Sequence, residues 1–140
     1  MDRAFLDTNL FVYLYSDTDV IKRKQVIRAI NQYECFVSTQ VLNEFCSVCI
    51  RKLALPVSDI EKAVGEIQDA CNLIVVDDAT VLAALGLHAQ WGYNYYDCLI
   101  LSSALESNCR YLLSEDMANN QTVNETLFIR NIFQLETPEG

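Results

Sequence analysis

The chain has 140 residues, of which 51% are hydrophobic and 21% are charged, and its formal net charge at pH 7 is −9. This length corresponds to one ordinary domain, and the composition is that of a folded chain with a substantial core rather than of a disordered one. The sequence contains no apolar run of the roughly 18 residues that a transmembrane helix needs, so no membrane association is expected. A protein this acidic is a poor non-specific binder of nucleic acid, because the phosphate backbone carries the same charge.

The negative charge is unevenly distributed. Residues 1–62 contain eight acidic and eight basic side chains, whereas residues 63–140 contain eleven acidic side chains and only two basic ones. If the second half of the chain contacts a phosphodiester, a cation has to mediate that contact.

Cysteine usage and the first residues indicate the compartment. The six cysteines are scattered through expected helices and strands, unlike the dense disulfide framework of a small secreted domain. Residues 1–3 lead directly into a strand without a signal-peptide pattern. These features predict a reduced, cytoplasmic protein, and the absence of a linker or internal repeat predicts one domain over residues 1–140.

Strands and helices are expected to alternate along the chain. The first half predicts a strand over residues 3–6, a helical turn after it, a helix up to residue 32, a strand over 35–38, a helix over 39–52, and a helix that begins with a capping box at 58–61 and ends near 70. The second half predicts the strongest strand at 73–76, helices over 79–90 and 95–107, strands over 110–113 and 127–129, and a polar tail after 134. Such alternation is typical of a parallel, doubly wound α/β sheet.

The helix up to residue 32 has a clear amphipathic pattern. Its apolar residues recur at helical spacing and are expected to be buried: Val20, Ile21, Val26, Ile27 and Ile30. Its basic residues are expected to lie outside: Lys22, Arg23, Lys24 and Arg28.

Four carboxylates are candidates for a shared site. Asp7 and Asp116 follow predicted strands, and ligands of open parallel sheets bind at the carboxyl ends of the strands. Glu44 lies on the apolar stripe of its helix, where an unpaired carboxylate needs a partner or a metal. Asp97 lies on the apolar face of the helix expected over residues 95–107. Each carboxylate also has a purely structural explanation. The two aspartates that follow strands could be helix caps or turn residues, Glu44 could be partly exposed at the edge of the apolar stripe, and Asp97 could complete a capping box with Asn94.

Carboxylates that converge repel one another unless a cation lies among them. Oxygen ligands without histidine or cysteine suit Mg²⁺ or Mn²⁺. Such an ion can hold a phosphate, lower the pKa of a bound water and stabilise an in-line displacement. The residues by themselves therefore predict a carboxylate metal site for phosphoryl chemistry.

Four blocks, in order and covering essentially the whole chain, resemble the PIN-domain family and, within it, the VapC-type toxin ribonucleases. The blocks are Phe5-Leu6-Asp7-Thr8-Asn9, Val41-Leu42-Asn43-Glu44-Phe45, Tyr95-Tyr96-Asp97-Cys98-Leu99-Ile100 and Tyr111-Leu112-Leu113-Ser114-Glu115-Asp116-Met117. The chain departs from the family pattern at Asn120, where glycine is frequent, at Ile132, where proline is frequent, and at Cys98, where alanine is usual.

The resemblance implies a three-layer α/β/α sandwich with a central parallel sheet. It implies an acidic pocket of catalytic and metal-binding residues, with two supporting polar residues: Asp7, Glu44, Asp97 and Asp116, supported by Asn9 and Ser114. It further implies Mg²⁺- or Mn²⁺-dependent cleavage of single-stranded RNA to 5′-phosphate and 3′-hydroxyl ends. A toxin of this kind would have a cognate antitoxin protein as partner and would form a homodimer.

Only one set of basic residues is dense enough to guide an RNA backbone: Lys22, Arg23, Lys24, Arg28, Arg51 and Lys52. The alternative is that they are simply a solvated face.

Two other functions remain open from the sequence. A phosphoryl-accepting domain, of the receiver or haloacid-dehalogenase kind, also places an aspartate after a parallel strand beside Mg²⁺. Such a domain needs a lysine late in the chain, and here lysine occurs only at 22, 24, 52 and 62. The second alternative is a PIN-fold module that binds RNA without cleaving it.

Overall fold

The computed structural model describes residues 1–117 and 119–134. Its elements are β1 (Arg3–Leu6), α1 (Thr8–Tyr15), α2 (Val20–Gln32), β2 (Glu34–Ser38), α3 (Thr39–Arg51), α4 (Val57–Ala70), β3 (Asn72–Ile74), α5 (Asp78–Trp91), α6 (Tyr95–Glu106), β4 (Tyr111–Leu113), β5 (Thr122–Val123) and β6 (Leu127–Arg130). Each expected strand and helix is present, with ends within two residues of the prediction. The expected polar tail after residue 134 lies outside the described residues.

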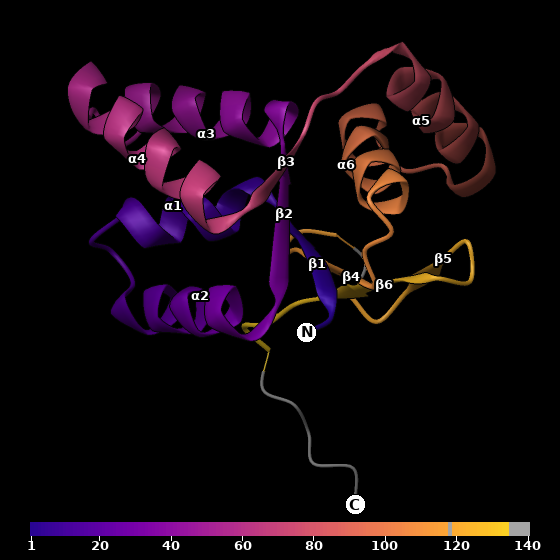
Figure 1. Ribbon diagram of the computed structural model, residues 1–140, viewed down its shortest axis with the longest axis horizontal. Helices are drawn as coiled ribbons and strands as arrows, with labels where there is room; N and C mark the ends of the chain where they lie inside the picture. Colours follow the sequence, from indigo (N-terminus) through magenta and orange to yellow (C-terminus); the bar gives the residue numbers. More distant parts are fainter. Residues whose placement is uncertain (118, 135–140) are drawn as a thin grey trace, which may run out of the picture.

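The six strands form one sheet in the order β3-β2-β1-β4-β6-β5. All neighbouring pairs are parallel except β5 with β6, which is antiparallel. Helices α1 to α4 lie on one side of the sheet, and α5 and α6 lie on the other (Figure 1). The predicted three-layer α/β/α sandwich is therefore confirmed, and the parallel strands bring their carboxyl ends to one edge.

The core is centred on β1, which has a strand on each side and helices on both faces. Ala4, Phe5 and Leu6 are completely buried. On one side of the sheet they are covered by α1 and α3, whose Phe11 and Phe45 are also buried. No helix among the described residues is both long enough and apolar enough to cross a bilayer.

The strand expected to be the strongest is short and lies at one edge of the sheet. Residues 73–76 were expected to form it, but β3 ends at Ile74, and Val75 is 64% exposed. The backbone N–H of Val76 donates to Thr39 Oγ1 (3.1 Å) instead of to a neighbouring strand. The chain leaves the ladder there because it has to reach Asp77, which caps α5 through Thr80 N–H (3.0 Å).

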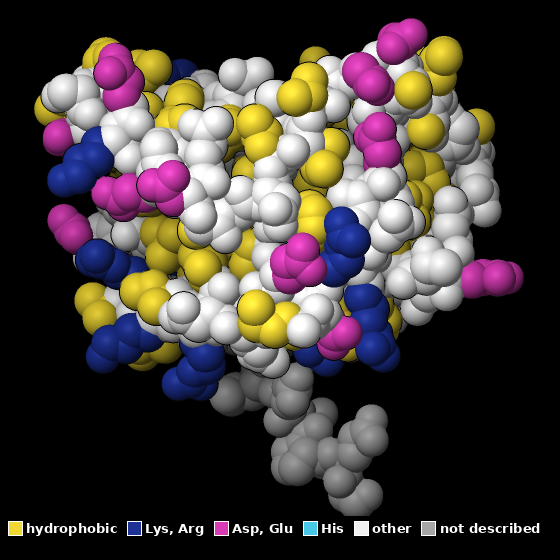
Figure 2. Space-filling view, in the orientation of Figure 1, with side chains coloured by type: hydrophobic (Ala, Val, Ile, Leu, Met, Phe, Trp, Pro, Cys, Tyr) yellow, Lys and Arg dark blue, Asp and Glu magenta, His cyan; other side chains and the backbone are white. Residues whose placement is uncertain are grey.

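The apolar face predicted for α2 is only partly buried. Val26 is buried, whereas Val20, Ile21 and Ile27 are exposed. Helix α2 packs mainly against α1 and β2, so one narrow stripe suffices to attach it. In Figure 2, hydrophobic and basic side chains lie together in the lower left, where Figure 1 places α2.

One local expectation was wrong, and one strand was not expected. The capping box predicted at 58–61 is absent, because α4 begins after Pro56 and has no side-chain cap. The antiparallel β5 was not expected; it joins β6 through Asn124 and Glu125, both of which have positive φ (51° and 65°). Asn120 also has a positive φ of 65°, which accounts for glycine being frequent at this position in the resembled family.

Candidate active site

Asp7 lies where β1 passes into α1. Its backbone N–H donates to the carbonyl of Leu113 (3.0 Å), which ties the end of β1 to the end of β4. Its side chain caps α1 by accepting from Thr8 N–H (2.7 Å), and it accepts a second hydrogen bond from Ser114 Oγ (2.8 Å). The predicted helix-cap role and a place at the sheet edge therefore coexist, and the residue is 8% exposed.

Glu44 reaches the same edge from α3. That helix starts directly after β2, capped by Ser38 Oγ, which accepts from Val41 N–H (3.3 Å). The Glu44 carboxylate accepts from Thr8 Oγ1 (2.7 Å) and from Gln40 Nε2 (2.9 Å). Both of its oxygens are thus held by neutral donors.

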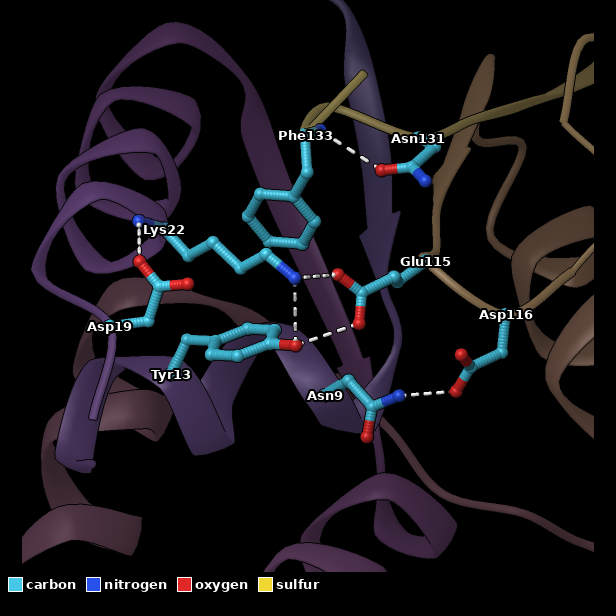
Figure 3. A network of polar contacts seen from close by, with 8 residues as sticks. All are labelled: Asn9, Tyr13, Asp19, Lys22, Glu115, Asp116, Asn131 and Phe133. Atoms are coloured by element: carbon cyan, nitrogen blue, oxygen red, sulfur yellow. Dashed lines mark hydrogen bonds and ion pairs between the residues drawn. The ribbon is translucent and has the colours of Figure 1, made fainter. Parts of the chain in front are cut away.

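Asp97 and Asp116 complete the acidic group. Asp97 lies in the first turn of α6, where its backbone N–H donates to the capping Asn94 Oδ1 (3.2 Å). Asp116 follows β4 and is exposed, and its carboxylate accepts from Asn9 Nδ2. The amide of Asn9 therefore connects α1 to the segment after β4 (Figure 3).

The four carboxylates line one pocket of about 320 Å³. Its wall is formed by Asp7, Thr8, Asn9, Glu44, Ser47, Val48, Arg51, Asp97, Ile100 and Asp116. Five of the six expected pocket and supporting residues are in this wall, and the sixth, Ser114, is hydrogen-bonded to Asp7. The structure therefore brings the predicted site residues together, while their roles remain predictions.

A larger hollow of about 580 Å³ lies between α5 and α6. Among the described residues, Glu106 is the one charged residue that lines this hollow, and its carboxylate accepts a hydrogen bond from Thr80 Oγ1 (2.9 Å). The smaller pocket is the better candidate for chemistry, because it alone of the two gathers several acids.

Burial and mutual repulsion weaken the acidity of two site residues. Burial raises the pKa of Asp7 to about 6; the hydrogen bonds from Ser114 and Thr8 oppose this rise, and the charges of Glu44 and Asp97 add to it. Burial also raises the pKa of Asp97, with further contributions from Glu44 and Asp116. A nearby cation would reverse both pKa shifts.

No ion pair among the described residues involves a pocket carboxylate. The two ion pairs within the described part of the chain are Lys22–Glu115 (2.5 Å) and Arg110–Asp2 (3.6 Å). The carboxylates of Asp7, Glu44 and Asp116 accept hydrogen bonds from hydroxyl, amide and backbone donors, which are neutral and do not cancel the carboxylate charge.

The predicted basic cluster is divided among different surroundings. Lys22 binds Glu115 and Tyr13, and it lies over the rings of Tyr13 and Phe133 (Figure 3). Arg51 lines the acidic pocket, whereas Arg28 lines a different hollow beside Tyr33. All members except Lys22 are exposed, and three of them line neither hollow: Arg23, Lys24 and Lys52. The steering role assigned to this set stays a prediction.

Two residues that donate hydrogen bonds to the site carboxylates were not predicted from the sequence. Thr8 contacts Asp7 through its N–H and Glu44 through its hydroxyl. Gln40 donates both to Glu44 and to the carbonyl of Tyr96 (3.1 Å), so it joins α3 to the start of α6. A signal was present for both, since Thr8 is at the first position of a capped helix and Gln40 lies one turn before Glu44.

The pocket suits a divalent ion by its chemistry. It offers carboxylate, amide and hydroxyl oxygens and neither histidine nor cysteine, the ligand set that Mg²⁺ and Mn²⁺ prefer. Within residues 1–117 and 119–134, no three Asp, Glu, His or Cys side chains lie close enough to hold one ion together. Mg²⁺ usually keeps several waters, so it would need fewer direct ligands from this group.

Comparison with known proteins gives the family. The PIN domain model matches residues 4–121, while no curated protein sequence gives a match. Among solved structures, a toxin–antitoxin complex from Klebsiella pneumoniae contains a chain with a TM-score of 0.71 and 14% identity; the alignment covers 94% of this chain and 99% of that one.

Two further structures are similar at the level of the fold. VapC20 of Mycobacterium tuberculosis, described as a sarcin-ricin loop cleaving toxin, has a TM-score of 0.65 and 16% identity over 81% of this chain and 89% of its own. VapBC2 of Rickettsia felis, bound to a DNA fragment from its promoter, has a TM-score of 0.62 and 18% identity over 92% of this chain and 98% of that one. With a family match over most of its length and this shared architecture, the chain belongs to the PIN domain family.

Proposed function

We propose that the protein is a metal-dependent endoribonuclease that cleaves single-stranded RNA. The observation that carries the proposal is the pocket that Asp7, Glu44, Asp97 and Asp116 line together, none of them in an ion pair among the described residues. Converging carboxylates of this kind are costly unless they bind a cation. The PIN family membership supports a nuclease in particular.

In this proposal the four carboxylates hold Mg²⁺ or Mn²⁺ directly or through water. When bound, the ion would supply positive charge for the scissile phosphate and would acidify a water molecule. The surrounding polar residues orient the ligands: Ser114 and Thr8 fix Asp7, Thr8 and Gln40 fix Glu44, and Asn9 fixes Asp116. Such a preorganised group needs little rearrangement at the moment of reaction.

We further propose that the protein acts as the toxin of a type II toxin–antitoxin pair, with a cognate antitoxin and a homodimeric state. Support comes from the structures that share the fold, which include a toxin–antitoxin complex and VapBC2 on promoter DNA. Co-purification of this chain with the product of a neighbouring reading frame, and inhibition of its RNA cleavage by that product, would test the proposed pairing.

The test of the nuclease activity is cleavage of a set of fluorescent single-stranded RNAs by purified protein in EDTA, Mg²⁺ or Mn²⁺. We expect cleavage only with a divalent ion, products with 5′-phosphate ends, and no cleavage by Glu44→Gln. The conservative Glu106→Gln serves as control, because Glu106 lies in the other hollow. Binding of RNA without cleavage under all conditions would support instead the non-cleaving module.

A further inference from the structure

One basic side chain lines the acidic pocket. Arg51 belongs to its wall, on the same helix as Glu44. Glu44, Ser47, Val48 and Arg51 are spaced by three, one and three residues, so they follow one stripe of α3 that faces the pocket. Two turns of helix separate the backbone positions of Glu44 and Arg51, about 10 Å along the axis.

The exposed side chain of Arg51 makes one hydrogen bond to its own helix. Its Nε donates to Ser47 Oγ (3.0 Å), one turn earlier in α3. This bond draws the side chain toward the helix N-terminus, the direction in which Glu44 lies. Arg51 therefore lines the pocket while its side chain remains accessible to solvent.

No carboxylate forms an ion pair with Arg51 among the residues that the structure describes. The Glu44 oxygens are occupied by Thr8 and Gln40, and the two ion pairs among the described residues involve Lys22 and Arg110. The planar guanidinium fork, with one nitrogen used for Ser47, retains donors suited to two oxygens of a phosphate.

We propose that Arg51 binds a phosphate of the RNA strand next to the scissile phosphate, as a binding residue about two helical turns from Glu44. This inference rests on the proposed function and specifies how its substrate is held. A polyanion crossing the pocket would meet negative carboxylates with their metal at one end and the Arg51 cation at the other. The substrate would thereby be fixed at two points, which sets the linkage presented for cleavage.

The experiment uses the full chain and one RNA that the wild type binds, carried through a series in which single phosphates are replaced by uncharged methylphosphonates. Binding is measured by fluorescence anisotropy with Ca²⁺ present, and cleavage with Mg²⁺. The variants are Arg51→Ala, Arg51→Lys and the control Lys62→Ala, which removes the same charge from an exposed site of α4 outside the pocket. Urea unfolding of each variant checks that the fold is retained.

We expect Arg51→Ala to weaken RNA binding and raise KM about tenfold or more, the factor that a charge-assisted hydrogen bond contributes, with kcat nearly unchanged. In the wild type, one methylphosphonate position beside the cleaved linkage should cost a similar factor, and in Arg51→Ala that position should cost nothing further. Arg51→Lys should recover part of the affinity, because it keeps the charge and loses the fork. Lys62→Ala should match the wild type.

An Arg51→Ala variant that responds to every methylphosphonate as the wild type does would overturn the inference. So would a fall in kcat with unchanged KM, since that would place Arg51 at the reacting phosphate. Failure of the proposed function gives a different result: the wild type then binds RNA but cleaves none with any divalent ion. The binding series decides the role of Arg51 independently of cleavage.

Discussion

Two neighbouring carboxylates, Glu115 and Asp116, have opposite surroundings. Glu115 pairs with Lys22 (2.5 Å) and accepts from Tyr13 (2.7 Å), whereas Asp116 accepts only the neutral amide of Asn9 among the contacts of Figure 3. Although burial raises the pKa of Glu115, the hydrogen bonds from Lys22 and Tyr13 and the lysine charge outweigh it, so its pKa lies below the ordinary value. The pKa of Asp7, by contrast, is raised.

The difference separates an anchoring carboxylate from those available to a cation. The Lys22–Glu115 pair attaches the segment after β4 to α1 and α2, which positions Ser114 and Asp116 on either side of it. In the pocket, neutral donors fix the direction of the Asp7, Glu44 and Asp116 carboxylates without cancelling their charge. Substitutions at the two kinds of carboxylate, and at the basic residues around them, test this division.

The largest effect should come from Asp7→Asn. The amide can keep both hydrogen bonds, accepting from Thr8 and donating to Ser114, so the geometry survives while the charge is lost. We expect cleavage to fall about 100- to 1000-fold, the range for removal of one strong electrostatic contribution at a reaction centre. The measurement is RNA cleavage at saturating Mg²⁺, and activity equal to the wild type would contradict a role for the Asp7 charge.

The same variant should be more stable than the wild type in EDTA at pH 7. The folded protein binds a proton at Asp7 with a pKa of about 6, above the value of 3.8 for an unperturbed aspartate, so stability is lost as the pH rises from about 4 to 6. The loss is up to about 3 kcal/mol at 1.36 kcal/mol per pKa unit. Urea unfolding between pH 4 and 7 should show this slope in the wild type and a smaller one in Asp7→Asn. An equal slope in both proteins would assign it to other groups.

Glu115→Gln should act on stability with the opposite pH dependence. The lowered pKa of Glu115 means that its pair contributes stability above the unfolded pKa near 4.5, and that this contribution disappears as the pH falls. The variant should therefore unfold at a lower temperature than the wild type at pH 7 and approach it at pH 3. Metal affinity should weaken slightly, because Asp116 is positioned by the same segment. A variant that is destabilised equally at both pH values would rule out the ion pair as the cause.

The smallest effect concerns the basic residues of α2. Arg23 and Lys24 are exposed, whereas Lys22 is engaged by Glu115. If this face steers RNA, Arg23→Ala with Lys24→Ala should flatten the salt dependence of RNA binding by about 0.7 for each phosphate no longer neutralised, and Lys22→Ala should lower stability instead. Anisotropy titrations at several salt concentrations measure the slope. An unchanged slope in the double variant would leave the cluster as a solvated face.

The amino-acid sequence by itself determined the order of the elements and the placement of Asp7 and Asp116. Apolar runs that stop at an aspartate mark buried strands, and parallel strands have to deliver their carboxyl ends to one edge, so two of the four acids were placed by periodicity and topology alone. Glu44 was recognisable because a carboxylate on an apolar stripe is unusual. In α2, the same reasoning overestimated the buried face, because periodicity shows which residues share a side and not how much of that side is covered.

The tertiary structure alone decided which charges are compensated. Lys22 and Glu115 are 93 residues apart, Thr8 and Glu44 are 36 apart, and Asn9 and Asp116 are 107 apart. No local pattern predicts such contacts, because they depend on how α1, α2, α3 and the segment after β4 pack around one sheet edge. The placement of Arg51 in the acidic pocket has the same origin: its sequence position marks only the end of an amphipathic helix, and the neighbouring β1, β4 and α6 supply the carboxylates that it faces.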